Sequence, residues 1–128
     1  MWVCWQIYFI CKYMWWHLIG YVIFAGGACG YGSLVDVKPL RARVGAVNPV
    51  LFKNGEGCGA CYKVRCLDKS ICSRRAVTII VTDECPGCSG GRHFDLSGAA
   101  FGHMAVAGEG GPLRNRGELP VLYRRYVF

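Results

Sequence analysis

Two aspartates at the ends of apolar runs are the residues of this chain best suited to acid/base chemistry. Asp83 closes the run 76–82, and Asp95 follows His93-Phe94 further along the chain. Paired carboxyl groups beside a histidine can hydrogen-bond sugar hydroxyls, or protonate a leaving sugar and activate water. The structural alternative for Asp95 is an N-cap of a helix that starts near Leu96. Three interpretations therefore remain: the two aspartates catalyse a reaction on a sugar, they bind a sugar, or Asp95 caps a helix.

A histidine and several aromatic residues are further candidates for contact with a sugar. His93 lies next to Phe94-Asp95, and Tyr31 and Tyr62 lie in segments rich in glycine and cysteine. Aromatic rings present an apolar face to a ligand, but the same rings also fill protein cores. The chain shows no Ser-His-Asp set, phosphate-binding loop or nucleotide motif, so the sequence implies no cofactor.

The cysteines indicate the compartment in which the protein works. The chain has nine, and seven of them lie between Cys29 and Cys88. Such density in a small domain indicates disulfides and an oxidising environment. The alternative is zinc bound by two C-x-x-C segments, Cys58–Cys61 and Cys85–Cys88. Zinc would leave three further cysteines without a role, so we expect disulfides and no metal.

The net charge of +7 comes from basic residues scattered along the chain. No recognisable nucleic-acid-binding module is present, so we expect no nucleic-acid partner. Arg124-Arg125, near the end of the chain, can line a groove or form a solvated face. A basic surface can also attract an acidic polymer, such as a polysaccharide that carries uronic acids, or an anionic lipid surface.

Residues 1–25 are almost continuously apolar and aromatic, with Lys12 as their one charged residue. Ala25 supplies the small residue that precedes a signal-peptide cleavage site, although the basic start of a signal is absent. The length of the segment also suits an uncleaved membrane anchor. We expect export, with residues 26–128 as the folded domain and a membrane association only if the leader is retained.

Short apolar runs between glycine-rich turns favour a mainly β fold. Residues 61–66 alternate as a half-buried strand does, and residues 76–82 form the strongest β-favouring run. Residues 119–128 predict a final strand, and residues 96–107 are the only good helix candidate. Two segments are less decided: residues 34–47 (strand or loop) and residues 50–52 (helical turn or strand). The glycine run 108–111 is expected to break the chain after the helix.

Five separated motifs, in order between about Gly26 and Tyr126, resemble the expansin family. The resemblance is closest to the β-expansin branch, which includes the group 1 allergens of grass pollen. The motifs are Gly26-Gly27-Ala28-Cys29-Gly30-Tyr31, Cys58-Gly59-Ala60-Cys61-Tyr62, Thr82-Asp83-Glu84-Cys85-Pro86, His93-Phe94-Asp95-Leu96-Ser97 and Phe101-Gly102-His103-Met104-Ala105.

The resemblance implies a six-stranded double-psi β-barrel with one short helix, similar to the catalytic domain of family 45 endoglucanases. In the family a cellulose-binding β-sandwich domain follows the barrel, and we expect it to be absent from this chain, which ends at Phe128. The family's opening segment is not recognisable, because the hydrophobic leader runs directly into Gly26. We therefore expect a barrel that is incomplete at its first strand.

The resemblance also implies part of a disulfide pattern. In the family the partner of Cys61 lies just after the final strand, where this chain has no cysteine, so we expect Cys61 to be unpaired. Cys85 and Cys88 either pair with each other, or one of them captures Cys61. The remaining implied pairs are Cys29 with Cys58 and Cys66 with Cys72.

In the related endoglucanases the residue that matches Asp95 protonates the leaving sugar, and the partner base comes from the early strand. Asp83 is the only plausible substitute for that base, and in expansins its counterpart is present without ordinary hydrolase activity. The resemblance thus implies binding without hydrolysis. Asp83, Asp95 and His93 are the candidates for hydrogen bonds to sugars, and Tyr31 and Tyr62 are the candidates for stacking.

The resemblance implies a secreted, monomeric plant cell-wall protein that loosens non-covalent contacts between matrix polysaccharides and cuts no bond. The expected ligands are xylan, mixed-linkage glucan and the cellulose surface. One alternative is a weak glycoside hydrolase with Asp95 as acid and Asp83 as base. The other is a truncated product without wall activity, either membrane-tethered or misfolded.

Overall fold

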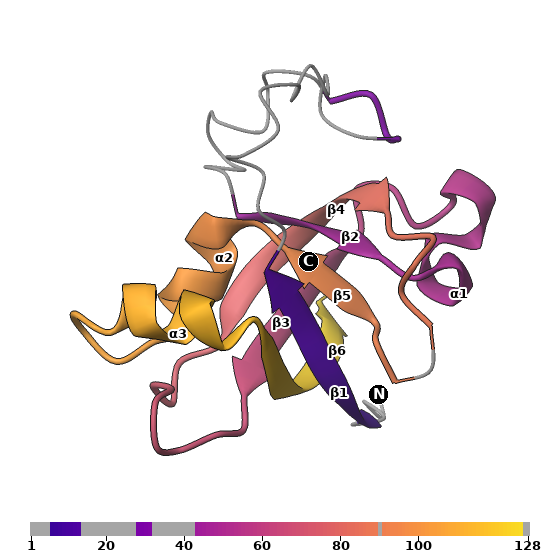
Figure 1. The fold of residues 1–128 in the computed structure, drawn as a ribbon. Helices are drawn as coiled ribbons and strands as arrows, with labels where there is room; N and C mark the ends of the chain where they lie inside the picture. Colours follow the sequence, from indigo (N-terminus) through magenta and orange to yellow (C-terminus); the bar gives the residue numbers. More distant parts are fainter. Residues whose placement is uncertain (1–5, 14–27, 32–42, 90, 127–128) are drawn as a thin grey trace.

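Six strands arranged as a closed barrel form the body of the molecule (Figure 1). The structure, a computed structural model, describes residues 6–13, 28–31, 43–89 and 91–126, with the backbone alone for residues 6–13. The strands are β1 (Gln6–Tyr13), β2 (Val44–Val47), β3 (Cys61–Cys66), β4 (Val77–Glu84), β5 (Phe94–Leu96) and β6 (Glu118–Tyr126).

The strand order around the barrel is β1-β5-β2-β4-β3-β6. Pairing is parallel between β1 and β5 and between β2 and β4, and it is antiparallel at the other contacts. Each strand has two hydrogen-bonded neighbours, so closure removes the open edges at which sheets aggregate. The predicted six-stranded, mainly β barrel is confirmed.

The first strand is complete in the structure, which corrects the expectation of an incomplete one. β1 comes from within the segment predicted as a leader, and it pairs with β5 in parallel and with β6 antiparallel. Strand pairing uses backbone donors and acceptors, and the aromatic and β-branched residues of Gln6–Tyr13 favour an extended backbone. That residues 1–25 are a leader stays a prediction. No helix of the described residues is long and apolar enough to span a membrane.

Inward side chains of the strands meet two short helices in one core. Val64, Ile79 and Phe94 are fully buried in the barrel. Next to it lie α2 (Gly98–His103) and α3 (Gly110–Arg116), which contact each other (Figure 1). α2 confirms the helix predicted between residues 96 and 107, although it is shorter than predicted.

α3 lies partly on the glycine run that was expected to break the chain. Glycine disfavours a helix, so no helix is predicted here from the sequence. Leu113 is fully buried, and its packing offsets the low helix propensity of Gly110 and Gly111. α1 (Pro49–Phe52), followed by the 3-10 turn η2 (Lys53–Gly55), resolves the undecided segment 50–52 as helical.

Three disulfides secure the loops between these elements. Cys85 pairs with Cys88, which decides between the two alternatives left open for these cysteines. In the other C-x-x-C segment, Cys58 is bonded to Cys29. Disulfides in both segments contradict the zinc alternative, because a disulfide sulfur is no thiolate ligand. The other bonds are Cys29–Cys58 and Cys66–Cys72, the pairs that the resemblance implies.

Candidate functional site

Asp83 and Asp95 lie in one row across three neighbouring strands. β2 runs between β4 and β5, and its residue Ala46 is paired with Asp83 on one side and with Asp95 on the other. Directly paired residues project from the same face of a sheet. Two strand spacings separate the two aspartate backbones by about 10 Å, with Ala46 paired between them. We call Asp83, Ala46 and Asp95 the carboxylate row.

An irregularity in β4 re-aims Asp83. Gly45 pairs with Val81 and Ala46 pairs with Asp83, so Thr82 is one extra residue on β4. A bulge of this kind bends the strand and changes the direction of the side chains that follow it. Gly45 lets the strands approach here, since a Cβ atom at this position would lie 2.9 Å from Cδ2 of Leu96.

The carboxylate of Asp83 holds the turn at residues 28–30 against the end of β4. Its Oδ1 accepts hydrogen bonds from the backbone N–H groups of Ala28 and Glu84, both at 2.8 Å. Next to Ala28, Cys29 is tied to the body of the barrel by its disulfide. Asp83 therefore has a structural task, while its Oδ2 has no hydrogen-bond partner in the described part of the chain.

Asp95 occupies the middle of β5 and is 5% exposed. The helix-cap alternative for this residue is wrong, because the cap of α2 is Ser97, whose Oγ accepts the N–H of Ala100 at 3.3 Å. The same hydroxyl accepts the N–H of Val44 at 3.4 Å, and the N–H of Ser97 donates to the carbonyl of Val44 at 2.9 Å. Ser97 thus joins the start of α2 to β2, and Asp95 remains a strand residue of the carboxylate row.

His93 is half-buried directly before β5. Its Nδ1 lies 2.8 Å from the carbonyl oxygen of Gly91, and its ring centroid lies 5.6 Å from that of Tyr123. Its own carbonyl accepts the N–H of Asn48 at 3.0 Å. These contacts hold the imidazole against Tyr123, at a position two residues before Asp95 in the chain.

Asn48 is a positioning residue that sequence analysis did not single out. It is 6% exposed, and its Oδ1 caps α1 by accepting the N–H of Leu51 at 3.0 Å. Its Nδ2 donates to the carbonyl of Arg92 at 3.4 Å. The Asn48-Pro49 pair is the available sequence signal, because it is typical of a helix N-cap followed by proline at N1.

The aromatic residues divide between the core and the surface. Tyr62 packs edge-on against Phe94 and Tyr123, with ring centroids 5.3 and 6.0 Å apart, and is 5% exposed. Burial raises the pKa of the Tyr62 hydroxyl, and Arg125 partly offsets this. A ring so enclosed has no free face for a sugar, so the structure places Tyr62 in the core. Tyr31 is half-buried beside Gly59 and keeps part of its surface exposed.

Cys61 is the free cysteine of the described residues, as expected. It begins β3, where its backbone pairs with Ile80 on one side and with Tyr126 on the other. Burial raises the pKa of its thiol, and the positive charge of Arg125 partly offsets this shift. The thiol is therefore predominantly protonated and a poor nucleophile at neutral pH.

Comparison with known proteins identifies the family. A family model described as lytic transglycolase matches residues 44–123, more than half of the chain. This match and the six-stranded topology define a double-psi β-barrel domain. The chain is also 83% identical over 101 residues to expansin-B3 of Arabidopsis thaliana, and this match covers 78% of the chain and 38% of that protein. The chain belongs to the β-expansin family, to whose N-terminal barrel domain it corresponds.

Other relatives agree with this assignment. Expansin-B16 of Oryza sativa subsp. japonica is 78% identical over 103 residues, with 78% of this chain and 38% of that protein covered. The crystal structure of an expansin from Clavibacter michiganensis matches with a TM-score of 0.52 and 26% identity over 66% of this chain and 35% of that one. A point mutant of the bacterial protein, solved in complex with cellohexaose, matches with a TM-score of 0.52 and 25% identity over the same shares. The chain therefore spans well under half the length of its relatives.

Proposed function

We propose that this barrel binds neutral cell-wall polysaccharides at the carboxylate row and weakens their non-covalent contacts without cutting a bond. The observation that carries the proposal is the alignment of Asp83 and Asp95 on either side of Ala46. Carboxylate oxygens accept hydrogen bonds from sugar hydroxyls, and His93, two residues before Asp95 in the chain, adds another polar group. The proposed ligands are xylan, mixed-linkage glucan and the cellulose surface, all of which present such hydroxyls. The bacterial relative bound to cellohexaose supports it.

The engagement of Asp83 favours binding over hydrolysis. Inverting hydrolysis needs an acid and a base about 6.5–9.5 Å apart with a water between them. The backbones of Asp83 and Asp95 are compatible with that spacing, but Asp83 is engaged by the turn at residues 28–30. A weak glycoside hydrolase with Asp95 as acid and Asp83 as base is the second candidate, and the shared row is what favours it.

Calorimetry with cellohexaose and xylohexaose tests the binding site. We expect Asp95→Asn to weaken binding about tenfold, because a charge-assisted hydrogen bond contributes about 1.5–3 kcal/mol. Asp68→Asn, which changes the same charge in a distant loop, is the matched control and leaves binding unchanged. Equal affinity of wild type and Asp95→Asn for both sugars would contradict the proposal.

Reducing-end release from xylan and mixed-linkage glucan decides between the two candidates. Binding without hydrolysis predicts no release above the level of Asp95→Asn. Release by the wild type that disappears in Asp95→Asn establishes the hydrolase instead. Non-reducing mass spectrometry of the secreted product, together with its sedimentation, tests export, the fate of residues 1–25 and the proposed monomeric state.

A further inference from the structure

The outer wall of the barrel gathers positive charge along β3 and β6. Lys63 and Arg65 project outward from β3, on either side of the fully buried Val64. In the antiparallel register Lys63 is paired directly with Arg124, and Arg65 is paired with Leu122. Like charges on directly opposed residues destabilise a sheet. Lys63 lies 4.6 Å from the centroid of the Tyr126 ring, and this cation–π contact partly offsets the repulsion.

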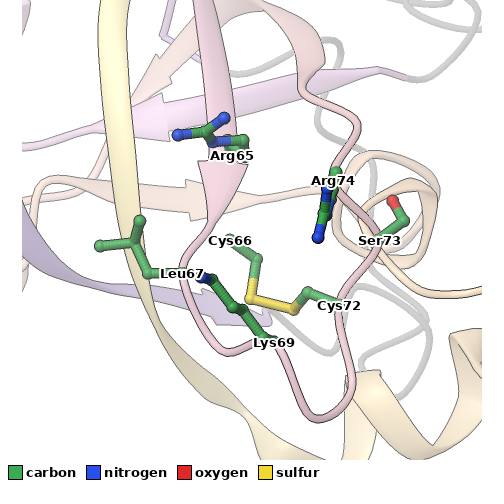
Figure 2. A pocket seen from close by; sticks show the side chains of 7 residues that line it. All are labelled: Arg65, Cys66, Leu67, Lys69, Cys72, Ser73 and Arg74. Atoms are coloured by element: carbon green, nitrogen blue, oxygen red, sulfur yellow. A yellow bond between two sulfur atoms is a disulfide. The ribbon is translucent and has the colours of Figure 1, made fainter.

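This wall is hollowed by two adjacent cavities that share Arg65 and Arg74. One has a volume of about 240 Å³, and the other has a volume of about 460 Å³. Figure 2 shows the larger one, with the Cys66–Cys72 disulfide between the strand that carries Arg65 and the loop that carries Arg74. The smaller is lined by Lys63, Arg65, Arg74, Ala76, Leu122 and Arg124. We call Lys63, Arg65, Arg74 and Arg124 the basic wall.

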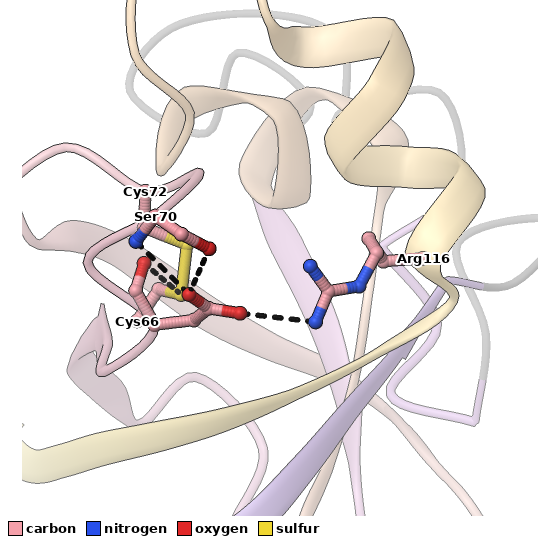
Figure 3. A network of polar contacts seen from close by, with 5 residues as sticks. Cys66, Ser70, Cys72 and Arg116 are labelled. Atoms are coloured by element: carbon pink, nitrogen blue, oxygen red, sulfur yellow. Dashed lines mark hydrogen bonds and ion pairs between the residues drawn. A yellow bond between two sulfur atoms is a disulfide. The ribbon is translucent and has the colours of Figure 1, made fainter.

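No acidic side chain lines either cavity. Asp68, in the loop beneath the larger one, is already neutralised by an ion pair with Arg116 of α3 at 2.9 Å (Figure 3). Hydrogen bonds from Ser70 and from Arg116 lower the pKa of Asp68, so it stays ionised and committed to this pair. A second ion pair joins Arg92 to Glu118, away from both cavities. The charges of Lys63, Arg65 and Arg74 thus have no acidic partner in the described part of the chain.

The loop that presents Arg74 is held in place at several points. The Cys66–Cys72 disulfide closes it, and Cys72 forms an isolated β-bridge with Ala105. The N–H of Ser73 donates to the carbonyl of Met104 at 2.8 Å. The backbone of the loop is therefore fixed relative to β3, and such preorganisation reduces the entropy cost of binding.

We propose that the basic wall is a second binding site, which takes the carboxylate groups of an acidic polysaccharide. The guanidinium forks of Arg65 and Arg74 match the two oxygens of a carboxylate. The apolar side chains of Leu67, Ala76 and Leu122 line the same cavities and offer contact to sugar rings. The two cavities together suit an extended, repeatedly charged chain, as in a polymer of uronic acids.

The lining residues disfavour other anionic partners. Tyr126, whose aromatic ring contacts the wall, is covered by Lys63 at 4.6 Å, and among the described residues neither cavity is lined by a further ring on which successive nucleobases could stack. The lining residues also lack the large apolar face that an interfacial membrane contact requires. This site shares no residue with the carboxylate row, so the inference goes beyond the proposed function and does not depend on it.

Binding of the 128-residue chain to polygalacturonate, in low salt and by calorimetry, is the direct test. We expect Arg65→Gln/Arg74→Gln to weaken binding about tenfold or more, because each residue loses a charge-assisted contact. Binding of the wild type should weaken as salt rises, and fully methyl-esterified polygalacturonate, which is neutral, should bind poorly. Arg65→Lys keeps the charge but loses the fork, so its loss should be intermediate.

Lys53→Gln is the single-charge control for Arg65→Gln and Arg74→Gln, because Lys53 is exposed and lines neither cavity. Thermal melts show whether each variant is folded, and Arg74→Gln provides an independent loop variant if Arg65→Gln unfolds. Polygalacturonate binding that is equal in wild type and in both single variants overturns the proposal. So does arginine-dependent binding to phosphatidylglycerol vesicles or single-stranded DNA without binding to polygalacturonate. Cellohexaose binding reports on the carboxylate row separately, so failure of one site does not imply failure of the other.

Discussion

The carboxylate row and the basic wall belong to the same barrel, but their charges are held in opposite ways. In the row, Asp95 is buried and Asp83 is tied to two backbone N–H groups. In the wall, Arg65 and Arg74 are exposed and no acidic residue neutralises them among the described residues. The row thus depends on strand register and core packing, whereas the wall depends on surface charge and on one anchored loop.

This difference predicts which changes affect which site. Substitutions in the core beneath β5 should damage the row together with overall stability. Substitutions on the wall should alter binding of an anion with little effect on stability, since exposed charges contribute at most about 1 kcal/mol. The two sites should therefore be separable by mutation.

Phe94→Ala is expected to have the largest effect. Phe94 is fully buried next to Asp95, with its ring centroid 4.7 Å from that of Tyr123. Truncation of a buried phenylalanine costs about 3–5 kcal/mol of unfolding free energy. Urea unfolding measures this loss, with Arg65→Ala as the wall counterpart at less than about 0.5 kcal/mol. Similar losses for both variants would remove the distinction between the two regions.

The sequence predicted the parts of the fold that local patterns determine. The alternation in 61–66 coincides with β3, because a half-buried strand repeats every two residues. The run 76–82 became β4, which extends two residues further, so that Asp83 lies inside the strand rather than after it. The motifs that carried the resemblance supplied the barrel and the two aspartates.

Other features depended on contacts that no local pattern records. The row exists because Ala46 lies between β4 and β5, and the undecided segment 34–47 showed no periodicity that would place it there. Ser97, not Asp95, caps α2, and both residue types are good caps two positions apart. The basic wall arises from the register of β3 with β6, which brings together residues about 60 positions apart along the chain.

Removal of the Cys66–Cys72 disulfide ranks second and should affect the wall more than the row. The bond closes a short loop, so the double variant Cys66→Ser/Cys72→Ser is expected to lose about 2 kcal/mol of unfolding free energy. Freed from this constraint, the loop would present Arg74 less precisely to an anion. We expect weaker polygalacturonate binding and unchanged cellohexaose binding at a temperature where the variant is folded. Equal losses for both ligands would show that the loop supports the whole barrel.

Asn48→Ala tests the row with a smaller perturbation. The substitution removes the cap of α1 and the hydrogen bond to the carbonyl of Arg92, at a cost of about 1 kcal/mol. The loop that leads to His93 and Asp95 would lose one of its supports. Calorimetry should show weaker cellohexaose binding and unaltered polygalacturonate binding. Asn48→Ser is the matched control, because serine keeps a capping oxygen without adding a charge and is too short to reproduce the hydrogen bond to the carbonyl of Arg92.

The smallest expected effect is on the pH dependence of stability, and it comes from His103 at the end of α2. Burial lowers the pKa of its imidazole, and the charges of Arg43, just before β2, and Arg75, next to Arg74 of the wall, lower it further. The unfolded chain therefore binds a proton more readily than the folded one, so stability is full at neutral pH and decreases as the pH falls below about 6.5. His103→Gln should remove this part of the pH dependence of the melting temperature, and Arg75→Gln should reduce it. If Arg75→Gln leaves the slope unchanged while His103→Gln abolishes it, Arg75 does not contribute, and burial with Arg43 sets the shift of the His103 pKa.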